Sequence, residues 1–234
     1  MPVAVRDYIS TVLNEMNEHG HRVWQVSKKV YQKRVVVDYI IRSTPIYEFF
    51  ELCDSTPLAK RVLDCGAGGK YPPLTLFADR GYETCGVEIG TKQVERAQSF
   101  CRKNGIQLNI FQADMRKLPF GDETFSFAFA YESIFFLTKN DIATTMCEIE
   151  RVLTPDGLCF VTFKSVDDSK RVTYGKKDMR ALLGSQGFAY HEDGEPDMYF
   201  SGFRILQRKK RIRKTLVKGE RGKRAYIDYV AQKT

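Results

Sequence analysis

The segment that decides the fold is Arg61-Val62-Leu63-Asp64-Cys65-Gly66-Ala67-Gly68-Gly69-Lys70. Its apolar run is short and stops at a glycine, which is typical of a buried strand. The glycines that follow allow the backbone to turn sharply and to approach a ligand closely, since a Cβ atom would obstruct both. The next stretch, 72–78, has prolines suited to a first helical turn and apolar residues suited to an inner helix face. A strand, a glycine turn and a helix in this order predict a nucleotide-binding crossover, with the ligand at the carboxyl end of the strand.

Strands and helices alternate after this crossover. Apolar runs predict strands that end at residue 88 and that span 108–111, 125–130 and 158–163, with helical spacing between several of them. The alternation predicts an α/β fold: a doubly wound, mostly parallel seven-stranded sheet with helices on both faces and an antiparallel C-terminal hairpin. We expect the hairpin to comprise a basic strand, a turn at Gly219–Gly222 and a strand from Ala225 to Ala231.

The length of 234 residues suffices for one substantial core with a small accessory layer. Helical patterns before the first strand predict an N-terminal helical cap or lid over 1–57, followed by the sheet domain over 58–234. No apolar stretch reaches membrane-spanning length, and Arg6, Asp7 and Glu15 lie where a signal peptide would need an apolar core. We therefore expect a cytoplasmic protein, a monomer or homodimer, that makes no contact with membranes.

Six cysteines are present without any Cys-x-x-Cys pair. Cys65, Cys85 and Cys159 fall in predicted buried strands, so we expect reduced thiols that pack in the core. The spacing predicts no metal site.

Two carboxylates bear on which ligand the glycine turn binds. Glu88 ends the second predicted strand about 20 residues beyond the turn, where an acid accepts hydrogen bonds from ribose hydroxyls. Asp64 stands directly before the glycines, where a dinucleotide would bring its pyrophosphate to the helix N-terminus. A carboxylate there repels phosphate and tolerates an ammonium or sulfonium group. The pair favours a cationic nucleoside ligand over a dinucleotide.

These segments together resemble a known family. Asp64-Cys65-Gly66-Ala67-Gly68 resembles motif I of the class I S-adenosylmethionine (SAM)-dependent methyltransferases, and Glu88 falls where that family has its ribose-binding acid. The segment 112–120 looks like the family's region after strand 3, and 150–157 resembles its usual turn before strand 5. Lys70 departs from the pattern, since many members have a third glycine there.

The resemblance implies a SAM-dependent methyltransferase with S-adenosylhomocysteine as its product. It places Asp114 at the adenine amino group and Met115 on the adenine ring. The cofactor-binding residues that we expect are Asp64, Gly66, Ala67, Gly68, Glu88, Ile89, Asp114, Met115 and Tyr131.

The part of the site that binds the methyl acceptor, which we call the acceptor end, is predicted in the segment after the fourth strand, Tyr131-Glu132-Ser133-Ile134-Phe135-Phe136. Tyr131 would border the sulfonium, and Glu132 would serve as a general base or a substrate anchor, so both are our catalytic candidates. His191, a lone histidine in a polar loop, is a weaker candidate and is expected to be exposed. The Asn/Asp-Pro-Pro-aromatic motif common in methyltransferases that modify nucleic acid bases is absent here, which favours a small-molecule acceptor.

The positive charge is concentrated in one segment. Residues 204–224 contain 11 Lys and Arg against the single acid Glu220, so this segment carries +10 and the rest of the chain carries −2. We interpret it as a solvated edge hairpin protected by its charges. The alternatives are an RNA methyltransferase that grips phosphates with this hairpin, and a SAM-binding protein without transferase activity.

Overall fold

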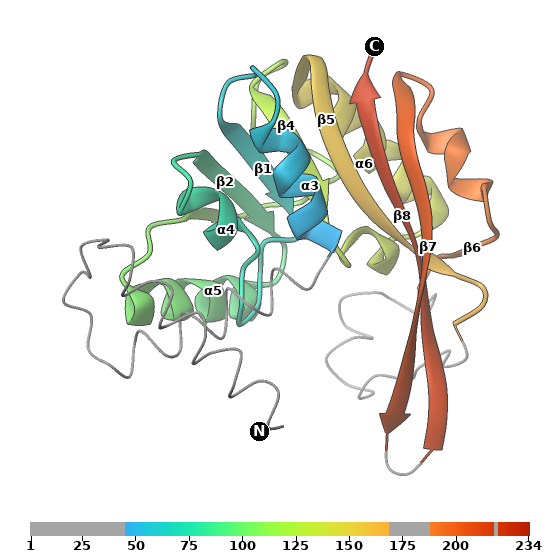
Figure 1. Ribbon diagram of the computed structural model, residues 1–234. Helices are drawn as coiled ribbons and strands as arrows, with labels where there is room; N and C mark the ends of the chain where they lie inside the picture. The colour runs from blue at the N-terminus through green and yellow to red at the C-terminus, as the bar shows by residue number, and fades with distance from the viewer. Residues whose placement is uncertain (1–44, 169–187, 218–219) are drawn as a thin grey trace, which may run out of the picture. The chain divides into compact units, whose positions relative to one another are not determined.

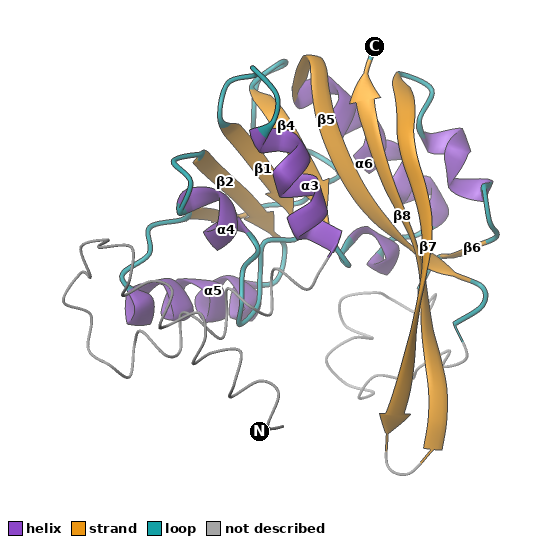
Figure 2. Cartoon of the chain, in the orientation of Figure 1, coloured by secondary structure: helices purple, strands orange, loops and turns teal. Residues whose placement is uncertain are grey.

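A computed structural model of the chain describes residues 45–168, 188–217 and 220–234, which belong to one compact unit over 44–234. Figure 1 follows the chain and Figure 2 marks its helices and strands. The described elements are, in order, α3 (Pro45–Asp54), β1 (Arg61–Cys65), α4 (Leu74–Ala78), β2 (Glu83–Glu88), α5 (Thr91–Asn104), β3 (Asn109–Gln112), β4 (Phe125–Ala130), η1 (Ile134–Phe136), α6 (Lys139–Val152), β5 (Leu153–Ser165), β6 (Tyr190–His191), η2 (Glu195–Tyr199), β7 (Phe203–Val217) and β8 (Glu220–Lys233).

The sheet confirms the predicted α/β architecture. Its strand order is β3-β2-β1-β4-β5-β8-β7, with the first five strands parallel and the last two joined as an antiparallel hairpin. The described part has eight strands where seven were predicted, because Tyr190 and His191 pair with the carboxyl end of β5. Strand β1 lies between β2 and β4, so the chain winds in opposite directions on either side of it, and a ligand crevice is expected at the carboxyl ends.

Helices cover both faces of the sheet, and alternate side chains of β4 pack against helices on opposite faces. Phe129 contacts the ring of Phe49 on α3, with centroids 6.5 Å apart. Ala128 and Ala130 belong to the buried cluster formed with the apolar face of α6. Small residues on that side let the helix pack closely against the strands.

Helix α3 packs with the sheet although it was predicted within the cap of 1–57. Phe49 and Phe50 are buried, and Phe50 meets Phe77 edge to face at 5.3 Å. This aromatic packing makes 45–54 part of the sheet unit. Residues 1–44 lie outside the described residues, so a cap formed by them stays a prediction.

The hairpin is longer than the sheet that it joins. Strand β8 pairs with β5 from Gln232, opposite Leu158, to Tyr226, opposite Lys164. The hairpin continues beyond that point and projects past the carboxyl end of β5 (Figure 1). We call residues 211–225 of this projection the basic arm. The turn predicted at Gly219–Gly222 was wrong in position, because Gly222 pairs with Thr215 and the ladder runs on to Val217 and Glu220.

Candidate active site

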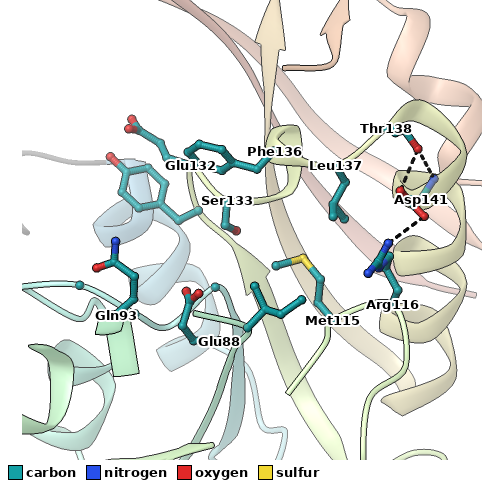
Figure 3. Close-up of a pocket in the computed structure, with 15 residues that line it drawn as sticks. Glu88, Gln93, Met115, Arg116, Glu132, Ser133, Phe136, Leu137, Thr138 and Asp141 are labelled. Carbon is teal, nitrogen blue, oxygen red and sulfur yellow. Dashed lines mark hydrogen bonds and ion pairs between the residues drawn. The ribbon is translucent and has the colours of Figure 1, made fainter. Parts of the chain in front are cut away.

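A cavity of about 410 Å³ opens at the carboxyl ends of β1, β2 and β4 (Figure 3). This volume lies in the usual range for small-molecule sites. The cavity is lined by Gly66, Gly68, Gly69, Glu88, Ile89, Gln93, Met115, Arg116, Tyr131, Glu132, Ser133, Phe136, Leu137, Thr138 and Asp141.

The glycine loop after β1 is hydrogen-bonded to β2 and leaves no room for a side chain at Gly66 or Gly68. The N–H groups of Gly66 and Ala67 both donate to the carbonyl of Val87, at 2.8 and 3.0 Å. Gly66 has φ +111°, and a Cβ there would lie 2.3 Å from the Cβ of Ser133. A Cβ on Gly68 would lie 2.6 Å from a carboxylate oxygen of Glu88. Both positions therefore require glycine, and the loop backbone itself forms one wall of the cavity.

Glu88 ends β2 inside the cavity, as predicted for the ribose-binding acid. Its Oε1 accepts a hydrogen bond from the N–H of Gly90 at 2.8 Å. This bond fixes the side chain, and Figure 3 shows the carboxylate directed into the space beside Gln93. Within the described residues, the hydrogen bonds of Glu88 leave Oε2 able to accept one from a ligand hydroxyl.

Asp64 lies beneath the glycine loop and does not itself line the cavity. Its side chain is buried, and Oδ2 has no hydrogen-bond partner among the described residues. Burial and the nearby charge of Glu88 raise the pKa of Asp64 well above its usual value. An unpaired buried carboxylate is unfavourable, so a cation bound against this loop would be stabilised.

The loop after β3 brings Met115 to the cavity and turns Asp114 away from it. Both carboxylate oxygens of Asp114 accept hydrogen bonds from the guanidinium of Arg116, at 2.6–3.0 Å, and the backbone N–H of Arg116 adds another at 2.9 Å. The Arg116 guanidinium therefore lowers the pKa of Asp114. Asp114 is thus engaged with its own loop, and Met115 and Arg116 form the cavity wall.

The N-terminus of α6 closes one end of the cavity. The hydroxyl of Thr138 accepts from the N–H of Asp141 at 3.1 Å and donates to its carboxylate at 2.9 Å. Asp141 also accepts from Arg116 at 3.3 Å. These bonds, dashed in Figure 3, join the β3 loop to the helix cap.

The opposite end is formed by the loop after β4, where Tyr131 and Glu132 line the cavity. Glu132 has φ +51°, a left-handed conformation that is uncommon for a residue other than glycine. Its carboxylate lies 3.3 Å from the guanidinium of Arg211 on β7. Burial and the charge of Glu132 raise the pKa of Tyr131 above its usual value, so this phenol stays protonated at neutral pH. Ser133 donates to the carbonyl of Cys65 at 2.5 Å and holds the loop over β1.

The structure brings most of the predicted site residues together. Gly66, Gly68, Glu88, Ile89, Met115, Tyr131 and Glu132 line the cavity, whereas Asp64, Ala67 and Asp114 do not. Sequence reasoning missed several lining residues, among them Gln93, Arg116 and Thr138. Thr138 had a detectable signal, since Thr-x-x-Asp is a capping pattern that places a hydroxyl at a helix start. Phe136 and Leu137 line the cavity as well, and Leu137 also packs against the core cluster.

His191 was expected to be exposed and is fully buried. Strand β6 carries it against the ring of Phe163, and its Nε2 lies 3.2 Å from the hydroxyl of Tyr199. It does not line the cavity, so the structure gives it no place in the candidate chemistry.

All six cysteines are free thiols. Cys65 and Cys159 are buried as expected, whereas Cys85 is only partly buried and packs against the edge of the core. Among the described residues, no group of three acidic, histidine or cysteine side chains is arranged to hold a metal ion. None of the helices in the described ranges is long and apolar enough to cross a membrane.

Comparison with known sequences finds a family that matches part of the chain. A family described as "Methyltransferase domain" matches residues 63–161. The chain is 32% identical over 140 residues to sterol methyltransferase-like 2 of Botryococcus braunii, a match that covers 59% of this chain and 34% of that protein. It is 31% identical over 103 residues to O-methyltransferase rstn1 of Aspergillus nomiae, covering 43% of this chain and 45% of that one. The chain thus matches about a third of the length of the first relative and less than half of the second.

Comparison of structures supports the same fold. A SAM-dependent methyltransferase from Methanosarcina mazei superposes with a TM-score of 0.55 over 81% of this chain and 97% of that one, at 18% identity.

Proposed function

We propose that this chain, whose residues 63–161 match a methyltransferase domain, is a class I SAM-dependent methyltransferase that transfers a methyl group from SAM to a small-molecule acceptor, releasing S-adenosylhomocysteine. The observation that supports this most directly is the pair of carboxylates around the glycine loop. Glu88 projects into the cavity and Asp64 lies buried beneath it with an unpartnered oxygen.

The residues present fit this cofactor. Two carboxylates beside the loop favour a ligand with cationic groups, and they disfavour the pyrophosphate of a dinucleotide. We assign Glu88 to the ribose hydroxyls, Ile89 and Met115 to the adenine ring, and Asp64 with the Gly66–Gly68 loop to the methionine portion. When bound, SAM supplies an electrophilic methyl group on a sulfonium centre. Asp114 acts on adenine binding through the loop that it holds with Arg116.

The acceptor end is assigned to Tyr131 and Glu132. Figure 3 shows Glu88 and Glu132 at opposite sides of the cavity, so an acceptor at Glu132 would approach from the side away from the ribose site. We propose that Tyr131 forms a wall beside the reacting groups. Glu132 either accepts the proton of a protonated nucleophile or anchors the acceptor by a hydrogen bond. Holding the two reactants in line accounts for most of the rate enhancement expected of such a transfer.

Three observations favour a small molecule over RNA. The cavity wall beside Glu132 includes Phe136 and Leu137, which suits an apolar or aromatic acceptor body. The cations of β7 from Arg208 to Arg211 all pair with carboxylates of this chain and are not available as a row of phosphate contacts. The relatives named as sterol and O-methyltransferases point to the same class of acceptor.

The cytoplasmic location and the state of monomer or homodimer remain part of the proposal.

A methyl-transfer screen tests the proposal. The full chain is incubated with SAM labelled on the methyl group and with pooled small-molecule acceptors or bulk RNA in separate reactions, and NAD binding is measured by calorimetry. We expect label to enter a small-molecule pool and NAD to bind negligibly. Label in RNA alone, or tight binding of NAD, would contradict the proposal. SAM binding without transfer to any pool would support the cofactor site and favour a binding protein without transferase activity.

A further inference from the structure

Glu132 is a charged residue that the loop after β4 brings to the cavity wall. Its φ of +51° lies in the left-handed region, which is unfavourable for a residue that carries a Cβ. The next residue, Ser133, fixes the loop by donating to the carbonyl of Cys65 at 2.5 Å. A backbone conformation of this kind persists only where surrounding contacts hold it, so the position of the Glu132 carboxylate is determined by its neighbours.

Arg211 is the neighbour that holds this carboxylate. It stands at the root of the basic arm, and its Nη1 and Nη2 atoms lie 3.3 and 3.4 Å from the same oxygen of Glu132, Oε1. Among the described residues, none forms a hydrogen bond with the other oxygen, Oε2. One oxygen of Glu132 is thus held by the protein, and the other can accept a hydrogen bond from a ligand in the cavity.

Arg211 is itself held by side chains other than Glu132. Its Nε and Nη2 atoms donate to the two carboxylate oxygens of Asp228 at 2.8 and 3.3 Å, and its guanidinium lies 4.4 Å from the centre of the Tyr226 ring. Asp228 accepts a further bond from the hydroxyl of Thr162 at 2.9 Å. The side chains of Arg211 and Asp228 are only 15% and 4% exposed. The guanidinium therefore has a fixed orientation, and it gives Glu132 a preorganised partner.

The charges at this end of the cavity oppose one another. Burial is the main cause that raises the pKa of Tyr131. The carboxylates of Glu132 and Asp228 raise it further, whereas the guanidinium groups of Arg211 and Arg213 lower it. Two positive and two negative groups thus act on the same point, so neither an anion nor a cation is strongly favoured there. A neutral polar group suits this end best.

Glu132 is better placed to accept a hydrogen bond than to take a proton. If it took a proton, its negative charge would no longer face the guanidinium of Arg211 at 3.3 Å, and the ion pair would be lost. A hydrogen bond from a neutral hydroxyl leaves that pair intact and is strengthened by the charge of the carboxylate. The apolar side chains of Phe136 and Leu137 line the same cavity and suit the body of such a molecule.

We propose that Arg211 is a positioning residue of this site: it holds Glu132 as a hydrogen-bond acceptor, and Glu132 binds a neutral hydroxyl group of a methyl acceptor whose body is apolar. The proposal rests on the proposed function, since it names the acceptor class of that same site. Arg211 acts through Glu132 and does not itself contact the acceptor.

A matched pair of fluorescent probes tests this inference without knowledge of the natural acceptor. The probes 2-naphthol and 2-methoxynaphthalene share an apolar ring system, and only the first donates an O–H group. Each is titrated into the full chain saturated with S-adenosylhomocysteine, and the absorption spectrum of bound 2-naphthol is recorded. Calorimetry with S-adenosylhomocysteine and circular dichroism are run on each protein.

The variants separate the residue that binds the hydroxyl from the residue that positions it. Glu132→Met removes the acceptor oxygens, and Arg211→Gln and Arg211→Lys change the partner that holds them. Arg208→Gln is the matched control, since it removes an equal charge from the same strand, where Arg208 pairs with Asp197 at the surface.

We expect 2-naphthol to bind wild type and Arg208→Gln about tenfold more tightly than 2-methoxynaphthalene, as one charge-assisted hydrogen bond would give. The ratio of the two affinities should fall to about one in Glu132→Met, and Arg211→Gln should lose most of it. Arg211→Lys should keep a ratio of about three, because an ammonium group cannot hold two carboxylates in one fork. The spectrum of bound 2-naphthol should be that of the neutral molecule.

Equal binding of the two probes to wild type would overturn the proposal. A purely structural role of Arg211 would weaken both probes in Arg211→Gln and leave their ratio at the wild-type value, which would overturn it as well. Where Arg211→Gln does not fold, Arg211→Lys decides, and a wild-type ratio there would refute the positioning role. The spectrum of the naphtholate anion would show that Glu132 takes the proton and would refute its role as an anchor. Failure of wild type to bind S-adenosylhomocysteine would instead count against the cofactor site and leave the probe comparison readable.

Discussion

The guanidinium of Arg211 lies 3.3 Å from the carboxylate of Glu132, a residue 79 positions earlier in the chain. The same guanidinium bonds to Asp228 at 2.8 Å and lies 4.4 Å from the centre of the Tyr226 ring. Asp228 in turn accepts from the hydroxyl of Thr162 at 2.9 Å. One side chain thus connects the hairpin, strand β5 and the loop that forms the acceptor end of the cavity.

Arg211→Gln should destabilise the fold by about 2–4 kcal/mol, because Asp228 would remain as a buried charge without its partner. Arg208→Gln is the control, since Arg208 pairs with Asp197 at the exposed surface and its loss should stay below about 1 kcal/mol. Urea unfolding of both variants measures the difference. Equal losses would show that the Arg211 network contributes no more than a surface ion pair.

Asp64→Asn should affect stability and cofactor binding in opposite directions. Because burial raises the pKa of Asp64, ionising it destabilises the folded state as the pH rises through that pKa. At pH 7 the neutral amide should stabilise the free protein by about 1–2 kcal/mol. The same change should weaken SAM binding by roughly tenfold to a hundredfold, since the negative charge beneath the glycine loop that attracts the cationic ligand is lost. Thermal unfolding and calorimetry on one preparation test both effects, and a variant that loses stability as well as affinity would contradict the assignment.

Asp114→Ala should weaken SAM binding by less than Glu88→Ala does. Asp114 holds Arg116 and does not line the cavity, so its removal loosens the wall beside Met115 without deleting a direct contact. Calorimetry gives the order of the two losses. A larger effect at Asp114 would mean that the carboxylate leaves Arg116 and contacts adenine directly.

Stability should depend on pH through His191. Burial lowers its pKa to about 4 from the usual 6.5, with the charge of Glu195 opposing that effect. Below pH 6.5 the unfolded chain binds a proton that the folded protein excludes, so stability falls with decreasing pH. Between pH 6.5 and 5 this contribution amounts to roughly 2 kcal/mol. The free energy of unfolding of wild type should therefore fall more steeply over that interval than that of His191→Gln, and parallel curves would rule the contribution out.

The elements that the sequence predicted well are those decided by local patterns. The segment Phe125–Ala130, which is apolar except for Ser126, forms β4 within the predicted bounds. The strand, glycine turn and helix from Arg61 to Ala78 form the expected crossover. The position of Glu88 in the cavity could be predicted because it depends only on where β2 ends and on the register of the parallel strands.

The features that the sequence did not predict depend on contacts between distant segments or on competing local bonds. The orientation of Asp114 is decided by a guanidinium two residues away that could equally have faced solvent. Burial of His191 follows from the pairing of β6 with β5, and two residues carry too little pattern to predict a strand. The basic segment was interpreted as a solvated edge because its pairing acids come from elements as distant as Glu48 and Asp193.

Calorimetry with SAM on wild type, Glu88→Ala and Glu83→Ala tests the central claim most directly. Glu83 is the control, since it begins the same strand β2 and pairs with Arg61 at the surface, away from the cavity. We predict micromolar binding to wild type and to Glu83→Ala, and a loss of roughly 1.5–3 kcal/mol in Glu88→Ala through its charged hydrogen bonds. Absence of SAM binding to wild type, or equal affinities in the two variants, would contradict the assignment of this cavity as the cofactor site.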